Sequence, residues 1–216
     1  MKARLDAIIQ REQAEYLDQL LPRRDSLLTE MEQYAAQHRV PIADPEVAAF
    51  LEITARTSKA MKTLEIGMAI GYSVIHLARG MGTNGLVVTI EPSEEMINAA
   101  SGFLSRANLF EQVRIERGKA LEVMSTLKET FDILFIDAVK EEYRGYLDLG
   151  LPLLNDGGVV IVDNLLWGGK VADEREQSDP STTALRDFNE YFINHHQLRA
   201  SVLSVGDGLG YAVKTK

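Results

Sequence analysis

Carboxylate and amide side chains follow two apolar runs in the second half of the chain. Asp137 ends the run FDILFID, and Asp163 and Asn164 end the run GVVIVDN. Runs that are apolar throughout are typical of strands in a parallel sheet covered on both faces, and parallel strands end at one edge of the sheet. We therefore expect the three side chains to lie close together. Their oxygens would suit Mg²⁺, or another divalent cation such as Ca²⁺ or Mn²⁺, although a single strand-end aspartate often only caps the next turn.

The stretch KTLEIGMAIGYS, residues 62–73, has the composition of a cofactor-binding turn between a strand and a helix. Gly67 would let the chain leave the strand in a conformation that a Cβ opposes. Gly71 would let the backbone approach a ligand at the positive end of the helix. The spacing E-x-G-x-x-x-G differs from the G-x-G-x-x-G fingerprint of dinucleotide-binding proteins. The turn therefore predicts a nucleotide-like cofactor and makes an NAD-dependent oxidoreductase the least favoured enzyme class.

Two further strand ends could contact the same cofactor. Glu91 ends the next predicted strand, where a carboxylate can accept hydrogen bonds from both ribose hydroxyls of a nucleoside. The alternative for Glu91 is an ordinary acidic residue at a helix N-terminus. Gly118, Lys119 and Ala120 follow the third predicted strand. They could address an adenine ring, or they could form a simple turn between strand and helix.

Lys140 and Trp167 each allow two interpretations. Lys140 lies three residues beyond Asp137 and could remove a proton from a substrate hydroxyl, but its charged surroundings, KEEYR, favour a solvated surface lysine. Trp167 is the only tryptophan and lies in the polar, glycine-containing segment LLWGGKVADEREQSDPST. A connection of this length favours a functional lid. Trp167 could form a wall against a flat substrate or pack beneath the loop.

Strands and helices alternate from Met61 onward, which is typical of a doubly wound α/β fold. The expected order is strands at 61–66, 86–91, 112–117, 131–136 and 157–163, helices near 72–80, 93–107, 119–128, 141–152 and 181–195, and last strands at 198–204 and 209–214. The last two strands, joined by a Val-Gly-Asp-Gly turn, predict an antiparallel hairpin on a mostly parallel, seven-stranded sheet. We expect one domain, in which three helices in residues 1–58 cover a Rossmann-like core at 59–216.

Composition excludes several classes of site. The chain has 216 residues, no cysteine and a net charge of −9, so disulfides and thiolate metal sites are absent. No apolar run approaches the ~18 residues that a membrane helix needs, and the charged first residues lack the core of a signal peptide, which predicts a cytoplasmic protein. A nucleic-acid substrate would need a local basic patch. Such a patch would be formed by Arg23, Arg24, Arg39 and Lys170.

Taken together, these residues resemble the metal-dependent O-methyltransferases of the catechol and caffeoyl-CoA type, class I enzymes that use S-adenosylmethionine (SAM). The motifs LEIGxxxGYS, FIDAxK and VxxDN occur in that order, and the resemblance covers about residues 40–216. It implies metal ligands at Asp137, Asp163 and Asn164, and Lys140 as the general base. It implies SAM contacts at Glu65, Gly67, Tyr72, Ser73 and Glu91, and the predicted cofactor set is completed by Gly71, Gly118, Ala120 and Asp137.

Two stretches narrow the resemblance. LPRRDSLLTEMEQYAAQHRVPI and SVGDGLGYAVKTK resemble the bacterial branch that methylates 5-hydroxyuridine at the wobble position of tRNA. Lys119 departs from the family, because many relatives have Asp at this position. Three functions stay open: an O-methyltransferase acting on a small catechol-like molecule, a tRNA-modifying enzyme, and a SAM-binding protein without catalysis. Relatives are commonly homodimers, and the N-terminal helices are the expected contact.

Overall fold

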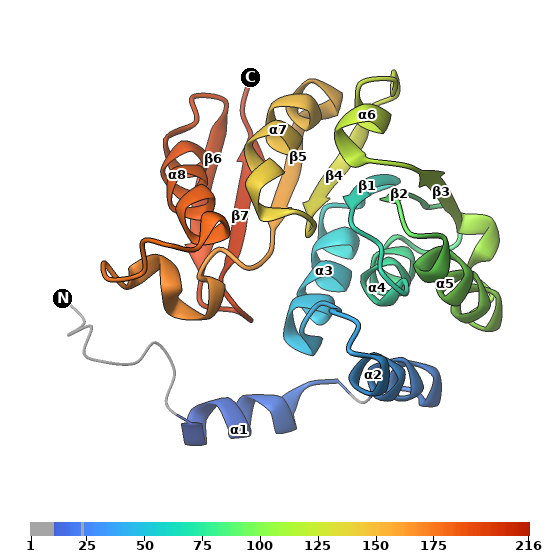
Figure 1. Cartoon of the computed structure of the whole chain (residues 1–216). Coiled ribbons are helices and arrows are strands. Elements are labelled where there is room, and N and C mark those ends of the chain that lie inside the picture. The colour runs from blue at the N-terminus through green and yellow to red at the C-terminus, as the bar shows by residue number, and fades with distance from the viewer. Residues whose placement is uncertain (1–10, 23) are drawn as a thin grey trace.

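A seven-stranded sheet forms the centre of the computed structural model, which describes residues 11–22 and 24–216 (Figure 1). The strands are β1 Lys62–Ile66, β2 Leu86–Glu91, β3 Val113–Arg117, β4 Phe131–Ile136, β5 Leu154–Val162, β6 Leu198–Leu203 and β7 Leu209–Lys214. Their order is β3-β2-β1-β4-β5-β7-β6, and only β7 runs antiparallel to its neighbours β5 and β6. This topology confirms the predicted doubly wound, mostly parallel sheet with a C-terminal hairpin.

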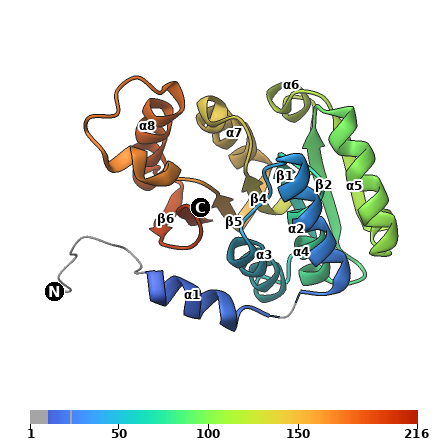
Figure 2. The same cartoon turned by 60° about the horizontal axis from the view of Figure 1, so that its bottom comes forward.

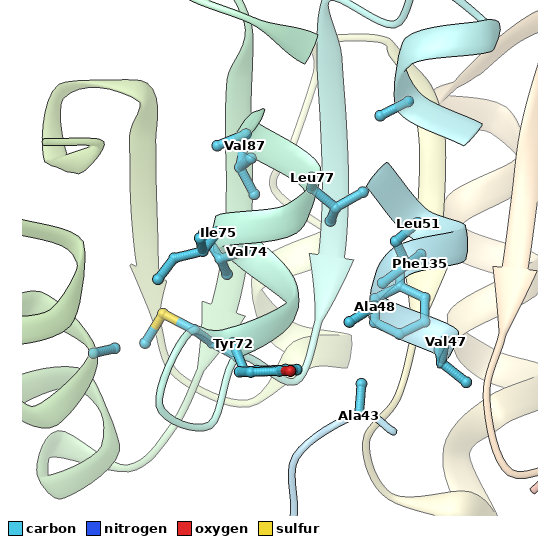
Figure 3. Packing of buried hydrophobic residues seen from close by; sticks show 14 of the residues in the cluster. Ala43, Val47, Ala48, Leu51, Tyr72, Val74, Ile75, Leu77, Val87 and Phe135 are labelled. Atoms are coloured by element: carbon cyan, nitrogen blue, oxygen red, sulfur yellow. The ribbon is translucent and has the colours of Figure 1, made fainter. Parts of the chain in front are cut away.

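Helices cover both faces of the sheet because neighbouring residues of the central strands point to opposite faces. Ile133 and Phe135 of β4 join one apolar cluster, and Leu134 and Ile136 join the other. Figure 3 shows part of the first cluster, in which Leu51 and Leu77 lie near Phe135. The first face is covered by α2 Ser26–His38, α3 Pro45–Thr57, α4 Tyr72–Met81 and α5 Glu94–Arg106, and the second by α6 Ala120–Met124, α7 Tyr143–Gly150 and α8 Pro180–Asn194.

The N-terminal helices behave differently from one another. Helix α2 begins after Asp25, whose carboxylate accepts a hydrogen bond from the backbone N–H of Leu28, and both α2 and α3 bury apolar residues against the sheet. Helix α1, Arg11–Leu20, extends away from the sheet (Figures 1 and 2). The side chains of residues 12–20 are exposed. Helices α2 and α3 thus pack on the sheet, whereas Tyr16, Leu17 and Leu20 of α1 are exposed in the part of the chain that the structure describes.

Two helices after the third strand are shorter than expected. Helix α6 ends at Met124, because the hydroxyls of Ser125 and Thr126 donate to the backbone carbonyls of Glu122 and Val123 and compete with further helical bonds. The expected helix at 141–152 is divided into the 3₁₀ turn η2 Lys140–Glu142, helix α7 and the 3₁₀ turn η3 Leu151–Leu153, which contains Pro152.

No described helix is long and apolar enough to cross a membrane. The single domain and the cytoplasmic location stay predictions.

Candidate active site

A cavity of about 870 Å³ opens at the carboxyl ends of the central strands. Its volume is in the range of cofactor and small-molecule sites. The extended segment of residues 40–43 before α3 forms part of its wall, a contribution that the sequence did not predict. Eight predicted site residues line it, namely Gly67, Tyr72, Ser73, Glu91, Ala120, Asp137, Lys140 and Asn164. Four others are not among the described residues that line it, namely Glu65, Gly71, Gly118 and Asp163.

The glycines of the first turn have different neighbours. Gly67 has a φ of +94°, and a Cβ at this position would lie 2.1 Å from the backbone oxygen of Asp137. Only glycine therefore lets the ends of β1 and β4 approach each other. Gly71, with a φ of +83°, faces Ala100 of α5, whose Cβ would lie 3.4 Å from a Cβ placed on Gly71. In this structure its freedom serves the turn into α4 and the contact between two helices, and the approach of its backbone to a ligand stays a prediction.

Glu65 lies behind the cavity wall. Its carboxylate is fully buried and accepts hydrogen bonds from Ser73 Oγ at 2.5 Å and Thr89 Oγ1 at 2.6 Å. Burial raises the pKa of Glu65 to about 7, although the two hydroxyls favour the charged form. In this structure Glu65 orients Ser73, which does line the cavity. Direct contact between Glu65 and the cofactor stays a prediction.

Glu91 joins the end of β2 to the glycine turn. One carboxylate oxygen accepts from the backbone N–H of Ala69 at 3.0 Å, and the other accepts from the N–H of Ser93 at 2.9 Å. Each oxygen retains a lone pair that could accept a bond from a ribose hydroxyl. Gly118 donates its N–H to the Glu91 backbone carbonyl at 3.2 Å, and the exposed Lys119 lines the cavity on that side.

Lys140 lies at the centre of the polar groups at the β4 and β5 ends. Its Nζ donates to Asp137 Oδ1 at 3.0 Å, to Asn164 Oδ1 at 2.6 Å and to the Tyr143 hydroxyl at 2.6 Å. The side chain is 10% exposed, so the interpretation of Lys140 as a solvated surface lysine is wrong. Tyr143 was not identified from the sequence, although it stands three residues after Lys140. Its hydroxyl donates to the backbone carbonyl of Asp163 at 3.1 Å and thus fixes Nζ relative to β5.

The predicted metal ligands fit a hard cation in their chemistry. Asp163 is 2% exposed and its Oδ1 accepts from the Asn164 N–H at 2.7 Å. Burial, together with repulsion from the nearby Asp137 carboxylate, raises the pKa of Asp163 to about 7. A bound cation would relieve that repulsion. Among residues 11–22 and 24–216, no three His, Cys, Asp or Glu side chains are close enough to hold a metal. Two carboxylates and one amide nevertheless form an all-oxygen set of ligands. In the structure Asp137 and Asn164 both accept a hydrogen bond from Lys140 Nζ, so Nζ would have to move before a metal ion could take that position.

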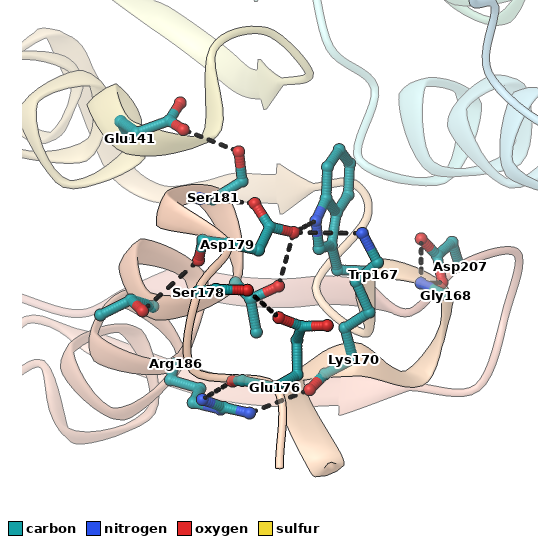
Figure 4. Close-up of polar contacts among 12 residues, drawn as sticks. Glu141, Trp167, Gly168, Lys170, Glu176, Ser178, Asp179, Ser181, Arg186 and Asp207 are labelled. Carbon is teal, nitrogen blue, oxygen red and sulfur yellow. Dashed lines mark hydrogen bonds and ion pairs between the residues drawn. The ribbon is translucent and has the colours of Figure 1, made fainter. Parts of the chain in front are cut away.

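Trp167 forms a wall of the cavity and also packs against the apolar cluster on the second face of the sheet. It begins the 3₁₀ segment η4, Trp167–Ala172, and its ring centre lies 5.6 Å from Lys140 Nζ. Figure 4 shows its indole N–H directed to Asp179, at 3.0 Å from Oδ2. Asp179 was not identified from the sequence, because the only signal, a Ser-Asp-Pro helix start, indicates nothing more than a cap.

Two members of the expected basic patch already form ion pairs. Arg24 contacts Glu32 at 3.1 Å, and Lys170 contacts Asp179 at 3.1 Å. Arg39 is exposed at the end of α2, and Arg23 lies outside the described residues. The part of the chain that the structure describes therefore gives limited support to a phosphate-binding patch.

Comparisons with known proteins agree with this geometry. A family described as O-methyltransferase matches residues 13–215. The chain is 32% identical over 209 residues to a catechol O-methyltransferase of Niastella koreensis, covering 92% of this chain and 94% of that protein. An O-methyltransferase from Bacillus cereus in complex with S-adenosylhomocysteine (SAH) superposes with a TM-score of 0.84 at 33% identity, covering 93% of this chain and 96% of that chain.

A second solved structure is similar to the same extent. The O-methyltransferase of Streptomyces achromogenes involved in tomaymycin synthesis, in complex with SAM, has a TM-score of 0.85 at 30% identity and covers 94% of this chain and 95% of that one. Since the family match spans residues 13–215 and the two solved structures cover 93% and 94% of this chain, the chain belongs to the O-methyltransferase family, and the predicted enzyme class, a SAM-dependent O-methyltransferase, is confirmed.

Proposed function

We propose that the enzyme transfers a methyl group from SAM to one of two adjacent oxygens on a small, planar, catechol-like substrate. The observation that carries the proposal is the contact of Lys140 Nζ with Asp137, Asn164 and Tyr143, beside the indole of Trp167. Asp137, Lys140 and Asn164 line the same cavity as the glycine turn, and Tyr143 lies buried behind them. One relative over nearly the whole chain is named a catechol O-methyltransferase, which supports the same substrate class.

The β1 and β2 side of the cavity would bind SAM. The turn at Gly67 and the start of α4 at Tyr72 and Ser73 would hold the methionine part, and Glu91 would accept hydrogen bonds from the ribose hydroxyls. Bound SAM supplies an electrophilic methyl group, which passes to the substrate oxygen. The protein contributes much of the rate by holding the two reactants in position.

Asp137, Asp163 and Asn164 would hold a divalent cation, with Mg²⁺ the first candidate. When bound, such a cation supplies a Lewis acid that favours loss of the substrate hydroxyl proton. Lys140 would accept that proton at Nζ. Burial raises the pKa of Tyr143 well above its ordinary value, so its phenol stays neutral, and it donates a hydrogen bond to the Asp163 carbonyl beside Lys140.

A 5-hydroxyuridine in tRNA is the second candidate substrate. Its ring hydroxyl and neighbouring carbonyl offer the same pair of oxygens as a catechol, and two stretches of the sequence resemble the branch that modifies tRNA. The small substrate is favoured because Glu141 and Glu142 line the cavity while Arg24 and Lys170 are engaged with carboxylates. These charges oppose a polyanion.

The experiment follows labelled methyl from SAM into a simple catechol and into bulk tRNA that carries 5-hydroxyuridine, with Mg²⁺ and with EDTA. Label that enters the catechol only with Mg²⁺ supports both the substrate class and the cation. Label that enters only tRNA rejects the small substrate in favour of the second candidate. Transfer that EDTA leaves unchanged rejects the cation, and no transfer to either acceptor rejects both substrates and favours a SAM-binding protein without this activity.

We also propose that α1 joins two copies of the chain. Tyr16, Leu17 and Leu20 expose apolar surface on this helix, which supports a contact with a partner. Light scattering on the purified protein should give the mass of a dimer, and Leu17→Glu should give the mass of a monomer. A wild-type monomer at micromolar concentration rejects this assembly.

A further inference from the structure

We propose that Asp179 is a positioning residue: its carboxylate holds the Trp167 indole as the wall against which the aromatic ring of the substrate packs. This inference deepens the proposed function and rests on it for the identity of the substrate. Trp167 touches the cavity, whereas Asp179 is not among the described residues that line it. Asp179 therefore acts on the substrate only through other side chains.

The Asp179 carboxylate accepts hydrogen bonds from several donors (Figure 4). Its Oδ2 accepts from Trp167 Nε1 at 3.0 Å, from Lys170 Nζ at 3.1 Å and from Thr182 Oγ1 at 2.8 Å. Its Oδ1 accepts from the backbone N–H of Ser181 at 3.2 Å, at the start of α8. The bonds from Thr182, Trp167 and Lys170 hold the pKa of Asp179 well below its usual range. These bonds therefore favour the charged form of the carboxylate.

The backbone conformation at Trp167 must be held by hydrogen bonds from neighbouring groups. Trp167, Gly168 and Gly169 follow one another in left-handed conformations, with φ values of 50°, 61° and 82°. This region is uncommon for a residue with a bulky side chain, so the surrounding structure must hold it. The Asp207 carboxylate accepts from the Gly168 N–H at 2.8 and 3.0 Å and fixes the backbone. Asp179 fixes the ring, and the two carboxylates therefore have separate tasks.

The rest of the loop is held by a group that does not touch the indole. The guanidinium of Arg186 donates to the backbone carbonyls of Lys170, Val171, Asp173 and Glu176. The loop backbone should therefore persist when the bond between Asp179 and the indole is removed. Ring position and loop folding can be separated by experiment, which makes the proposal testable.

The position of the ring matters because of what lies next to it. Trp167 lines the same cavity as Asp137, Lys140 and Asn164, and its ring centre lies 5.6 Å from Lys140 Nζ. A planar ring packed on the indole would present its edge, and hence its hydroxyls, to that polar end. If the indole moved, an aromatic substrate would lose one wall of its site, while the β1 and β2 side would be unchanged. We therefore expect an effect on the KM of the substrate and none on SAH binding.

Trp167 is the only tryptophan, so its fluorescence reports the ring without any assay of activity. The test variant is Asp179→Asn, which keeps an Oδ1 acceptor for the Ser181 N–H but turns an amide donor toward the indole N–H. The control is Asp173→Asn in the same loop, whose carboxylate bonds to Arg175 and not to Trp167. We expect red-shifted emission and stronger acrylamide quenching in Asp179→Asn only. We also expect its catechol KM to rise about tenfold, as for the loss of a bond to a charged group, with an unchanged Kd for SAH.

A third variant identifies the bond responsible. Trp167→Phe keeps an aromatic ring but removes the N–H, so adding Asp179→Asn to it should change the KM by much less than in the wild type. Unaltered fluorescence in Asp179→Asn overturns the positioning role, as does a full tenfold effect in the Trp167→Phe background. If the wild type methylates no catechol, the proposed substrate fails, and the fluorescence result still decides whether Asp179 holds Trp167.

Discussion

The two sides of the cavity are built in different ways. On the β1 and β2 side, backbone turns at strand ends form the surface, and the Glu91 carboxylate accepts from two backbone N–H groups there, while Glu65 is buried behind them. On the opposite side, a loop is held by exposed and half-buried side chains, with Asp179 bonded to Trp167. The difference indicates that the fold itself determines the cofactor side, whereas individual side chains determine the substrate side. Substrate selectivity can therefore change by single substitutions that leave cofactor binding intact.

The largest effect should come from the polar end of the substrate side. Asp163→Ala removes one of the proposed cation ligands, and we expect turnover to fall by about 10³-fold or more, because a Lewis acid contributes several kcal/mol to such a reaction. The Kd for SAH, measured by calorimetry, should change little. Asp163→Asn keeps the volume and serves as the control for packing. Full turnover in Asp163→Ala would reject the cation, and lost SAH binding would reject the independence of the two sides.

Gly67 is the point at which the two sides meet, so its replacement should affect both. In Gly67→Ala the new Cβ would meet the Asp137 carbonyl at 2.1 Å in a backbone of positive φ, and we expect a loss of about 3 kcal/mol of stability. SAH binding and turnover should both weaken. Gly168→Ala is the matched control, because its φ is also positive but its Cβ would have no neighbour within 4 Å, so only about 1 kcal/mol is expected. Equal urea midpoints for the two variants would show that the contact with Asp137 is unimportant.

Burial of Glu65 makes the stability of the cofactor side depend on pH. Folding raises the pKa of Glu65 from 4.5 to about 7, so the folded state favours the protonated carboxyl. Its stabilising contribution is complete below pH ~4.5 and is lost as pH rises through about 7. Relative to the wild type, Glu65→Gln should gain on the order of 2 kcal/mol between pH 5 and pH 8. Parallel stability profiles from urea unfolding would contradict this, and the exposed Glu95→Gln should give such a parallel profile.

The strand ends could be predicted from sequence because their signals are local. Continuous apolar runs indicate β4 and β5, and the last residue of each run identifies Asp137 and Asp163. Gly67 was predictable because a positive φ at the end of a strand favours glycine. These positions depend on residues close to them in the chain, so pattern and propensity are sufficient.

The remaining parts of the site depend on contacts between distant segments. The local pattern around Lys140 favours a surface residue because its neighbours are charged, whereas its burial depends on Asn164, 24 positions away. Glu65 is a strand-end acid in sequence, and its carboxylate is held behind the cavity by Ser73 and by Thr89, which lies 24 positions away on the neighbouring strand. The hydrogen bond between Trp167 and Asp179 spans a loop whose sequence has no hydrophobic periodicity. In each case the missing information is the partner.

Tyr72 tests the difference between the two sides most sensitively, because it lies on the cofactor side but is held by a side chain. Its hydroxyl donates to Glu32 Oε1 of α2 at 2.6 Å, and Arg24 contacts the same oxygen at 3.1 Å. If the backbone turn determines this side, Tyr72→Phe and Glu32→Gln should each weaken SAH binding by only about threefold, the scale of one modest hydrogen bond.

The two substitutions should also be non-additive, since both act on the same bond: Tyr72→Phe removes its donor, and Glu32→Gln removes the charge of its acceptor. The control is Glu30→Gln on the same helix, which breaks the contact of Glu30 with Arg106 and should leave the Kd for SAH unchanged. A loss of 30-fold or more in Tyr72→Phe, on the order of 2 kcal/mol, would contradict the comparison. In that case a side-chain bond from α2 would control cofactor binding, and the cofactor side would be as dependent on single side chains as the wall at Trp167.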